Sequence, residues 1–238
     1  MELALKKKHG QKYKASFFDN SWDTIIDACQ SGDVPETWAI ADSKDMTING
    51  TNYQIDIIGK NHDTYAMGGT APLTFQLHDC YGTKDRMNTS KTNSGGWANS
   101  YMRTSVLPSI LSRMPQEVQT GIKQVNKLTS DGNMSSYIRT TADKLFLLSQ
   151  KEITGNAGGS FYGSYVQNTV DGEGSRYAYY ATGHSTIKTV GGAASEWWER
   201  SPIFQNQNAF AFIDSSGTRC SDYNNANFYW GVSPAFCF

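Results

Sequence analysis

The sequence lacks a long apolar run and an excess of charge of one sign, the two features that would indicate a membrane or nucleic-acid partner. No apolar run approaches the roughly 20 residues needed to span a bilayer. No charge of one sign is in excess either, because 21 Lys and Arg residues stand against 22 Asp and Glu residues. A chain with this balance has no global field that attracts nucleic acid or an anionic membrane. The sequence therefore predicts neither a nucleic-acid partner nor insertion into a membrane.

Closely spaced cysteines are missing as well. The four cysteines, Cys29, Cys80, Cys220 and Cys237, are scattered and form no C-x-x-C pair of the kind that binds zinc or performs redox chemistry. We expect most of them to be buried thiols. Only Cys220 and Cys237 are candidates for a disulfide, because both fall in strand-like segments that are close in sequence.

Motifs for nucleophilic or nucleotide chemistry are not found. The sequence has no G-x-S-x-G, no G-x-x-x-x-G-K-[ST], and no G-x-G-x-x-G after a strand. Two His-Asp pairs, His62-Asp63 and His78-Asp79, could supply metal ligands or an acid/base couple if the fold joined them. Because no further His-rich cluster accompanies them, we favour hydrogen bonding in turns and at strand edges. A metal-dependent hydrolase or oxidase stays a minor alternative.

Two carboxylate pairs could perform glycosidase chemistry, namely Glu196 with Glu199 and Asp171 with Glu173. Strand positions three apart point to opposite faces, and the second pair lies in a Gly-rich turn where carboxylates are usually solvated. We therefore interpret all four as surface charges. The sequence predicts no enzyme, no cofactor and no metal site.

The chain is rich in aromatic residues and in glycine. Its 238 residues are enough for one domain with a sizeable core, and 22 Gly, 13 Tyr, 11 Phe and 6 Trp are typical of loop-rich folds that contain β-structure. Residues 1–14 carry five lysines and lack the apolar stretch of a secretory signal, so we expect a basic, poorly ordered arm before a domain over 15–238. Export would need another route, such as release inside a virion.

Helical and strand signals alternate in the first half. Ser21 precedes an apolar face at i, i+3, i+4 and i+7 from Trp22 to Cys29, which predicts a short helix ending near Gly32. Asn49-Gly50 between alternating segments predicts a β-hairpin, and residues 74–77 predict a further strand. Pro108 should end or kink a helix that begins near Trp97.

The second half is read in the same way. Pro115 suits the first position of a helix whose buried face carries Val118, Ile122 and Val125. The run Leu145–Leu148 predicts a strand, and residues 154–192 form mainly loop. Final strands are expected over 196–200, 209–213 and 232–238.

The C-terminal segment, residues 201–238, differs in kind. It holds five Asn and nine aromatic residues but three charged ones, a mixture seen in antibody binding loops. Asn and Ser also make turns, and aromatic residues also fill cores. We assign Phe210, Phe212, Val232 and Phe236 to the core and expect displayed loops at 205–208 and 223–229. The candidate ligand-binding residues are Gln205, Asn206, Gln207, Asn208, Ser215, Arg219, Ser221, Tyr223, Asn224, Asn225, Asn227 and Tyr229.

Several motifs also occur in a characteristic order. They are Ile57–Asp63, Leu73–Phe75, Gly95–Trp97 followed by Ser100 and Met102-Arg103, Leu145–Ser149, Trp197–Pro202 and Gly231–Cys237. Together they resemble a domain-of-unknown-function family (DUF6273-like) common in gut bacteria and their phages. The resemblance implies an α+β, loop-rich variant of the C-type-lectin-like fold shared with formylglycine-generating enzymes, with two or more helices packed on small antiparallel sheets. Trp197, Trp198, Arg200 and the Gly95-Gly96-Trp97 turn would be its scaffold.

Some members of that family resemble variable proteins of diversity-generating retroelements, whose C-terminal surface residues are rewritten for ligand binding. The resemblance implies a display protein with a variable region over about 197–238, binding a protein or glycan on a cell surface, and carried on a phage tail or a bacterial surface. A fixed structural or adhesion module is the alternative. The sequence does not define an oligomeric state.

Departures from the related folds limit what carries over. The calcium-dependent sugar-binding signatures of true C-type lectins are absent, and so is the closely spaced cysteine pair of the formylglycine-generating enzymes. Calcium-mediated sugar binding and oxidase activity are therefore not expected. Glu199 also replaces an apolar residue that is common in the family between Trp-Trp and Arg-Ser-Pro.

Overall fold

The first helix of the described residues forms where the sequence predicts it. The computed structural model describes residues 12–156, 159–161, 164–166, 169–220 and 225–238. In it, α2 (Trp22–Ser31) begins after Ser21, whose Oγ accepts the backbone N–H of Thr24, and ends at Gly32 in the left-handed conformation. Its buried face consists of Trp22, Ile25, Ala28 and Cys29.

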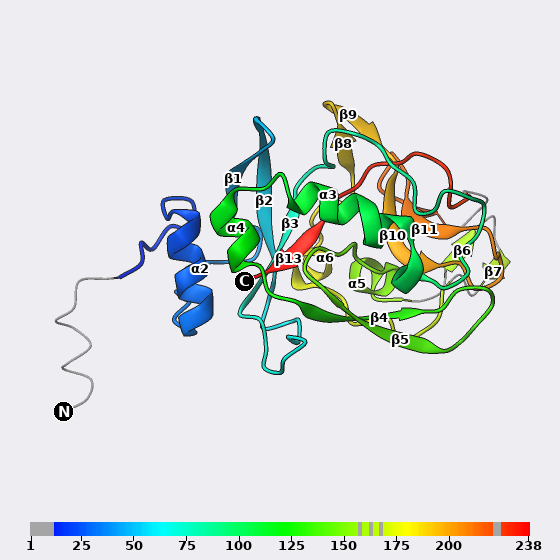
Figure 1. The fold of residues 1–238 in the computed structure, drawn as a ribbon, viewed down its shortest axis with the longest axis horizontal. Coiled ribbons are helices and arrows are strands. Elements are labelled where there is room, and N and C mark those ends of the chain that lie inside the picture. Colours follow the sequence, from blue (N-terminus) through cyan, green and yellow to red (C-terminus); the bar gives the residue numbers. More distant parts are fainter. Residues whose placement is uncertain (1–11, 157–158, 162–163, 167–168, 221–224) are drawn as a thin grey trace.

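A four-stranded antiparallel sheet combines three strands from the first third of the chain with one strand near the C-terminus. Its order is β1 (Ser43–Ile48), β2 (Thr51–Lys60), β3 (Leu73–Leu77) and β13 (Ala235–Cys237). The predicted Asn49-Gly50 turn links β1 to β2 with positive φ at both residues. Figure 1 shows β13 in the middle of the molecule, with α2 towards one end and β10 and β11 towards the other.

The remaining strands form small antiparallel sheets. A three-stranded sheet consists of β10 (Trp197–Pro202), β11 (Phe210–Ile213) and β12 (Arg219–Cys220). Three two-stranded hairpins accompany it: β4 (Val125–Ser130) with β5 (Ile138–Asp143), β6 (Gly159–Phe161) with β7 (Ser164–Val166), and β8 (Lys188–Val190) with β9 (Ala193–Ser195).

The helices after α2 are all short. They are the 3₁₀-helix η1 (Trp97–Asn99), the π-helical turn η2 (Met102–Val106), α3 (Leu107–Leu111), α4 (Gln116–Gly121), α5 (Gln150–Thr154) and α6 (Ala178–Ala181). Few helices on small antiparallel sheets make this a mixed α/β protein. None of the helices in the described ranges is long and apolar enough to cross a membrane.

Two predictions for the middle of the chain are wrong in their extent. The helix expected from Val118 through Val125 ends at Gly121, because Ile122 is extended (φ −59°, ψ 125°) and Val125 begins β4. Pro115 is the residue before α4 rather than its first residue. Pro108 does not end the helical stretch: it stands in the first turn of α3, directly after the π-helical turn η2, and the backbone stays helical from Met102 to Leu111.

The apolar run Leu145–Leu148 is buried as expected, but it is not a strand. It forms one isolated bridge, between Phe146 and Ala235, and leads directly into α5. At the start of the chain, Tyr13 is buried and donates its hydroxyl hydrogen to Asp27 at 2.8 Å, so the domain includes residues before 15. Residues 1–11 of the predicted arm lie outside the described ranges.

Candidate ligand-binding surface

The β10–β11 loop, residues 203–209, is held from inside by one amide side chain. Asn93 is completely buried, and its Nδ2 donates to the carbonyl oxygens of Ile203 (3.1 Å), Asn206 (2.9 Å) and Ala209 (2.8 Å). The backbone N–H of Asn93 donates to the carbonyl of Gln207 at 2.7 Å. Four backbone acceptors of the loop are therefore satisfied by one residue, and the backbone of the loop is fixed.

Two glycines permit this close packing at the base of the loop. A Cβ on Gly132 would lie 1.9 Å from the carbonyl oxygen of Asn93, and one on Gly96 would lie 2.1 Å from that of Ser130. Both glycines also have positive φ, at 69° and 55°. The Gly95-Gly96-Trp97 motif is thus part of the scaffold, as predicted, and Trp97 is completely buried.

The predicted ligand-binding residues divide by exposure. Five are exposed, namely Gln205, Gln207, Asn208, Ser215 and Tyr229, and three are half-buried, namely Asn206, Asn225 and Asn227. Asn206 also shapes its own turn, since its Oδ1 accepts the backbone N–H of Asn208 at 3.0 Å. The side chain of Arg219 and residues Ser221, Tyr223 and Asn224 lie outside the described part of the chain. None of the eight described side chains belongs to the core.

A second segment, residues 225–230, lies beside the loop. Ala226 is buried and its N–H donates to the carbonyl of Asn208 at 2.7 Å, while Ala209 and Asn225 form an isolated bridge. The loop 203–209, the turn 214–218 and the segment 225–230 are called the C-terminal surface below. The expected core residues beneath it, Phe210, Phe212, Val232 and Phe236, are all buried.

Charged residues that sequence reasoning missed also reach this surface. The guanidinium of Arg86 lies 5.6 Å from the ring centroid of Tyr101 and 5.4 Å from that of Tyr229, and Lys84 lies over Trp230 at 5.4 Å. Both cations belong to a segment more than a hundred residues earlier. No local signal in the sequence could have placed them here.

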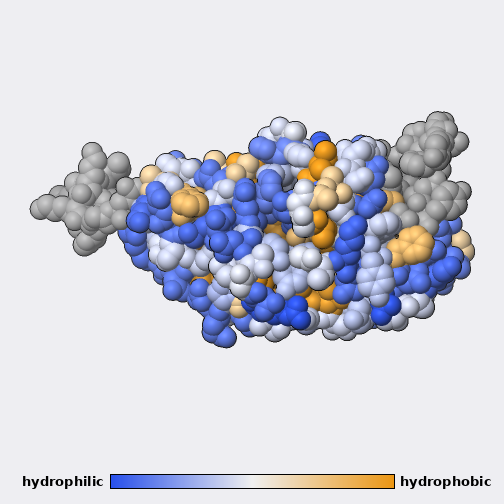
Figure 2. All heavy atoms as spheres, turned by 90° about the horizontal axis from the view of Figure 1, so that it is seen from above, coloured by the Kyte–Doolittle hydropathy of each residue, from blue (hydrophilic) through white to orange (hydrophobic). Residues whose placement is uncertain are grey.

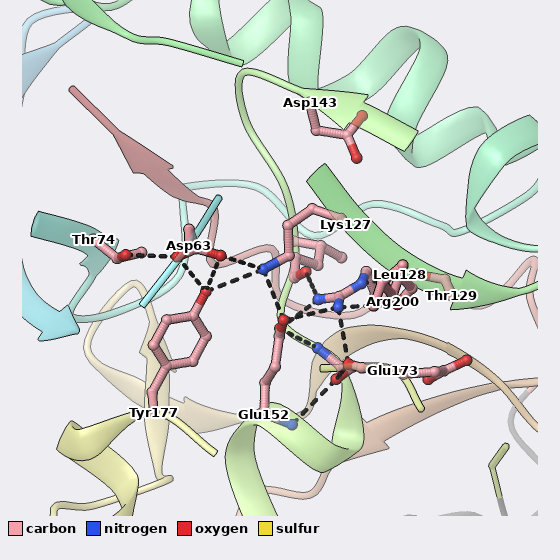
Figure 3. A network of polar contacts seen from close by, with 12 residues as sticks. Asp63, Thr74, Lys127, Leu128, Thr129, Asp143, Glu152, Glu173, Tyr177 and Arg200 are labelled. Carbon is pink, nitrogen blue, oxygen red and sulfur yellow. Dashed lines mark hydrogen bonds and ion pairs between the residues drawn. The ribbon is translucent and has the colours of Figure 1, made fainter. Parts of the chain in front are cut away.

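The scaffold residue Arg200 is the centre of a buried polar network. Its guanidinium is fully enclosed and donates to Thr129 Oγ1 (2.8 Å), to the carbonyl of Leu147 (2.9 Å) and to Glu152 Oε1 (2.9 Å). Figure 3 shows side chains from several segments converging on this centre. Asp63, Lys127, Glu152, Glu173, Tyr177 and Arg200 are called the buried network below.

Glu152 and Asp63 share the ammonium of Lys127. Lys127 Nζ lies 2.7 Å from Glu152 Oε1 and 2.7 Å from Asp63 Oδ1. Burial alone would raise the pKa of both carboxyl groups, but nearby cations outweigh it. Lys127 lowers the pKa of Asp63 to about 2. Arg200 and Lys127 lower the pKa of Glu152 below its usual range. Glu152 also completes a capping box with Ser149 at the start of α5.

The interpretation of Glu173 and Glu199 as surface charges is wrong. Both side chains are completely buried. Glu173 accepts the backbone N–H of Ser130 at 2.8 Å and the hydroxyl of Ser201, and its burial raises its pKa to about 7. Its partners come from distant strands, which is why a turn-like local sequence misled the prediction. Asp171 is exposed as expected and pairs with Lys151.

The two His-Asp pairs serve separate contacts. His78 Nδ1 lies 2.6 Å from Asp56 Oδ2, and this hydrogen bond raises the pKa of His78. His62 stacks on Tyr177 with the ring centroids 3.9 Å apart, while its neighbour Asp63 belongs to the buried network. Among the described residues, no three His, Cys, Asp or Glu side chains are grouped so that they could hold a metal ion.

Cys237 does not form the disulfide considered for it. It is a free, buried thiol, with Sγ 3.5 Å from Thr74 Oγ1, because β13 belongs to the four-stranded sheet while Cys220 ends β12 of another sheet. Cys29 and Cys80 are free and buried, as expected. Burial raises the pKa of both thiols to about 12, so neither is a reactive thiolate at neutral pH.

One pocket of the described structure lies apart from the predicted residues that the structure describes. A pocket of about 940 Å³ is lined by Tyr65, Met67, Lys123 and Lys144 among others, and it contains none of the twelve candidates. Figure 2 shows one face, on which hydrophilic side chains predominate and hydrophobic ones gather near the middle. The eight described candidates therefore lie outside this pocket.

A comparison with protein families places most of the chain in one family. The family described as "Domain of unknown function (DUF6273)" matches residues 73–238, and the chain belongs to this family. The comparison with curated proteins gives no significant match, and neither does the comparison with solved structures.

Proposed function

We propose that this chain is a ligand-binding display protein with a C-type-lectin-like fold, of the kind that serves as the variable protein of a diversity-generating retroelement. The observation that carries the proposal is the β10–β11 loop. Its backbone is held by the buried Asn93, while the side chains of Gln205, Gln207 and Asn208 are exposed. A loop built in this way can change its side chains without losing its shape.

The chemistry of the surface suits recognition of a protein or glycan on a cell surface. Amides and hydroxyls supply hydrogen bonds, and Tyr229, packed against Arg86, supplies a flat contact area with little rotamer entropy to lose. Aromatic residues in such surfaces are frequent hot spots, and truncation of one costs about 1–3 kcal/mol of binding. The carrier we propose is a phage tail or a bacterial surface.

The test compares two quadruple variants of equal composition. One combines Gln205→Ala, Gln207→Ala, Asn208→Ala and Tyr229→Ala on the C-terminal surface. The control combines Gln30→Ala, Gln116→Ala, Asn52→Ala and Tyr137→Ala, which are exposed elsewhere. Binding of the labelled proteins to a panel of intact gut bacteria is measured by flow cytometry, and folding is measured by thermal unfolding.

We expect the surface variant to keep its melting temperature and lose binding to the cells that the wild type binds, while the control keeps both. Unfolding of the surface variant, or undiminished binding by it, would contradict the proposal. Sequencing of sibling genes tests the diversification itself. A neighbouring reverse transcriptase and siblings that differ at adenines in the codons of these residues are expected, whereas invariant siblings would indicate a fixed adhesion module.

A further inference from the structure

The buried network contains a nucleophile that the binding surface does not use. The Lys127 side chain is 2% exposed, and its Nζ lies 2.7 Å from Asp63 Oδ1, whose side chain is 3% exposed. The rings of Phe146 and Tyr177 lie 4.3 Å and 5.5 Å from the same nitrogen. An amine and a carboxyl group are thus held in contact, away from bulk water.

The groups around this pair are those that amide formation requires. Glu152 Oε1 lies 2.7 Å from Lys127 Nζ, and Arg200 holds Glu152 in the anionic form, which is the form that accepts a proton. On the other side, Thr74 donates to Asp63 Oδ2 at 2.6 Å and Tyr177 donates to the same oxygen at 2.8 Å. Two hydroxyl donors on one oxygen can stabilise the negative charge of a tetrahedral intermediate.

We propose that Lys127 and Asp63 form an intramolecular amide bond, with Glu152 as the proton acceptor. One ammonium proton first passes through Glu152 to Oδ1 of Asp63, which leaves a neutral amine and a neutral carboxyl group, and Lys127 Nζ then attacks Cγ of Asp63. The Nζ–Cγ bond forms and the Cγ–Oδ1 bond breaks. Oδ1 leaves as water with two of the three protons that the ammonium carried, one of them through Glu152. The third proton stays on the amide nitrogen, so neither an oxidant nor any other reactant is consumed.

Asp63 rather than Glu152 is the partner in the amide, because the two carboxylates differ in the contacts that they would lose. Glu152 binds Arg200 through both oxygens and also caps α5, so an amide there would leave the buried guanidinium without its counter-charge. After amide formation at Asp63, Oδ2 still accepts its two hydroxyl donors. The charges that remain on Glu152 and Arg200 form a matched pair.

Burial favours the bond in two ways. The two groups are already in contact, and fixed neighbours of this kind react as if present at about 10⁵ M or more. In water, hydration of the separate ions opposes condensation, but here folding has already removed that hydration. The amide replaces two enclosed charges with one neutral group, and this proposal stands independently of the ligand-binding function.

The test is the intact mass of the purified wild-type chain under denaturing conditions, after several days of folded storage at neutral pH. We expect most molecules to be lighter than the sequence mass by one water molecule. Trypsin should then leave residues 61–84 joined to residues 124–139, uncut after Lys127, and fragmentation should place the link between Asp63 and Lys127. A wild-type chain of full mass would overturn the proposal.

Two further outcomes are decisive. Loss of water without the joined peptides would indicate cyclisation elsewhere, for instance at Asp131-Gly132 or Asp171-Gly172, and would overturn the proposal, as would a link to Glu152. The Lys127→Arg variant keeps the cation but removes the amine, and it is expected to have full mass. Because this variant can also fail to fold, the peptide map of the wild type decides the question without it.

Discussion

The buried network and the C-terminal surface distribute polar groups in opposite ways. The buried network encloses charged and polar side chains from distant segments, each with a fixed partner, such as Arg200 with Glu152. The C-terminal surface presents mainly uncharged amides and hydroxyls, which contact solvent or their own turns. Ion pairs therefore hold the interior of this protein in one arrangement, whereas the polar side chains of the displayed loops can be replaced without disturbing the fold. The same substitution should therefore have unequal effects in the two regions.

The largest contrast is expected from two arginines. Arg200→Met leaves Glu152 and Glu173 without their nearest guanidinium inside the protein, and we expect a loss of about 3–5 kcal/mol of unfolding free energy. Arg139→Met breaks an exposed pair with Asp131 and should cost at most about 1 kcal/mol. Urea unfolding of both variants measures the difference. Equal losses would show that the interior ion pairs do not hold the fold.

Glu173 should make stability depend on pH. Its folded pKa of about 7 exceeds the unfolded value of 4.5, so the folded state holds this proton more tightly. The resulting stabilisation is fully present below pH 4.5 and is lost as the pH rises through about 7. Glu173→Gln should remove this decline, which amounts to about 3 kcal/mol between pH 5 and pH 8. Urea unfolding across that range is the measurement, and the exposed Glu36→Gln variant should follow the wild type.

Substitution of two asparagines compares the contribution to stability of the base of the C-terminal surface with that of its exposed loop. Asn93→Ala removes one of two hydrogen-bond donors from each of three loop carbonyls and leaves a cavity in the scaffold, and it should cost about 2–3 kcal/mol. Asn208→Ala, within the loop itself, should change stability by less than about 0.5 kcal/mol. Thermal unfolding checks both values. Amide exchange in residues 203–209 should quicken in the first variant and stay unchanged in the second.

The smallest contrast comes from removing one hydroxyl group in each region. Tyr177 donates to both oxygens of Asp63, so Tyr177→Phe should cost about 1–2 kcal/mol. Tyr229 is 52% exposed, and Tyr229→Phe should leave the unfolding free energy unchanged within about 0.5 kcal/mol. Chemical denaturation resolves the two, and a comparable cost at Tyr229 would place that ring in the scaffold.

Locally encoded features of the fold were predictable from the sequence. Ser21, the spaced apolar face and Gly32 define α2 because caps and periodicity act within a few residues. The Asn49-Gly50 turn fixes its hairpin for the same reason. The exposed positions of the β10–β11 loop followed from composition alone.

Features that depend on distant partners were not predictable. The local sequence around Glu173 predicts a solvated turn, but Ser130 and Ser201 from two distant strands enclose its carboxylate in the folded protein. Asn93 is 110 positions from Ile203, so no window of sequence reveals that it holds the loop. Val125 continued a helical spacing, but its pairing with Asp143 places it in β4. In each case a tertiary contact overrode a local preference.

Glu152 connects the short helix α5 to the buried network. The same carboxylate accepts the N–H of Ser149 at the start of α5 and binds Lys127 and Arg200. A five-residue helix has almost no stability of its own. If α5 opened alone, the buried guanidinium of Arg200 would lose its counter-ion. Its amide protons should therefore exchange only when the whole molecule unfolds, so this small helix reports the global unfolding equilibrium.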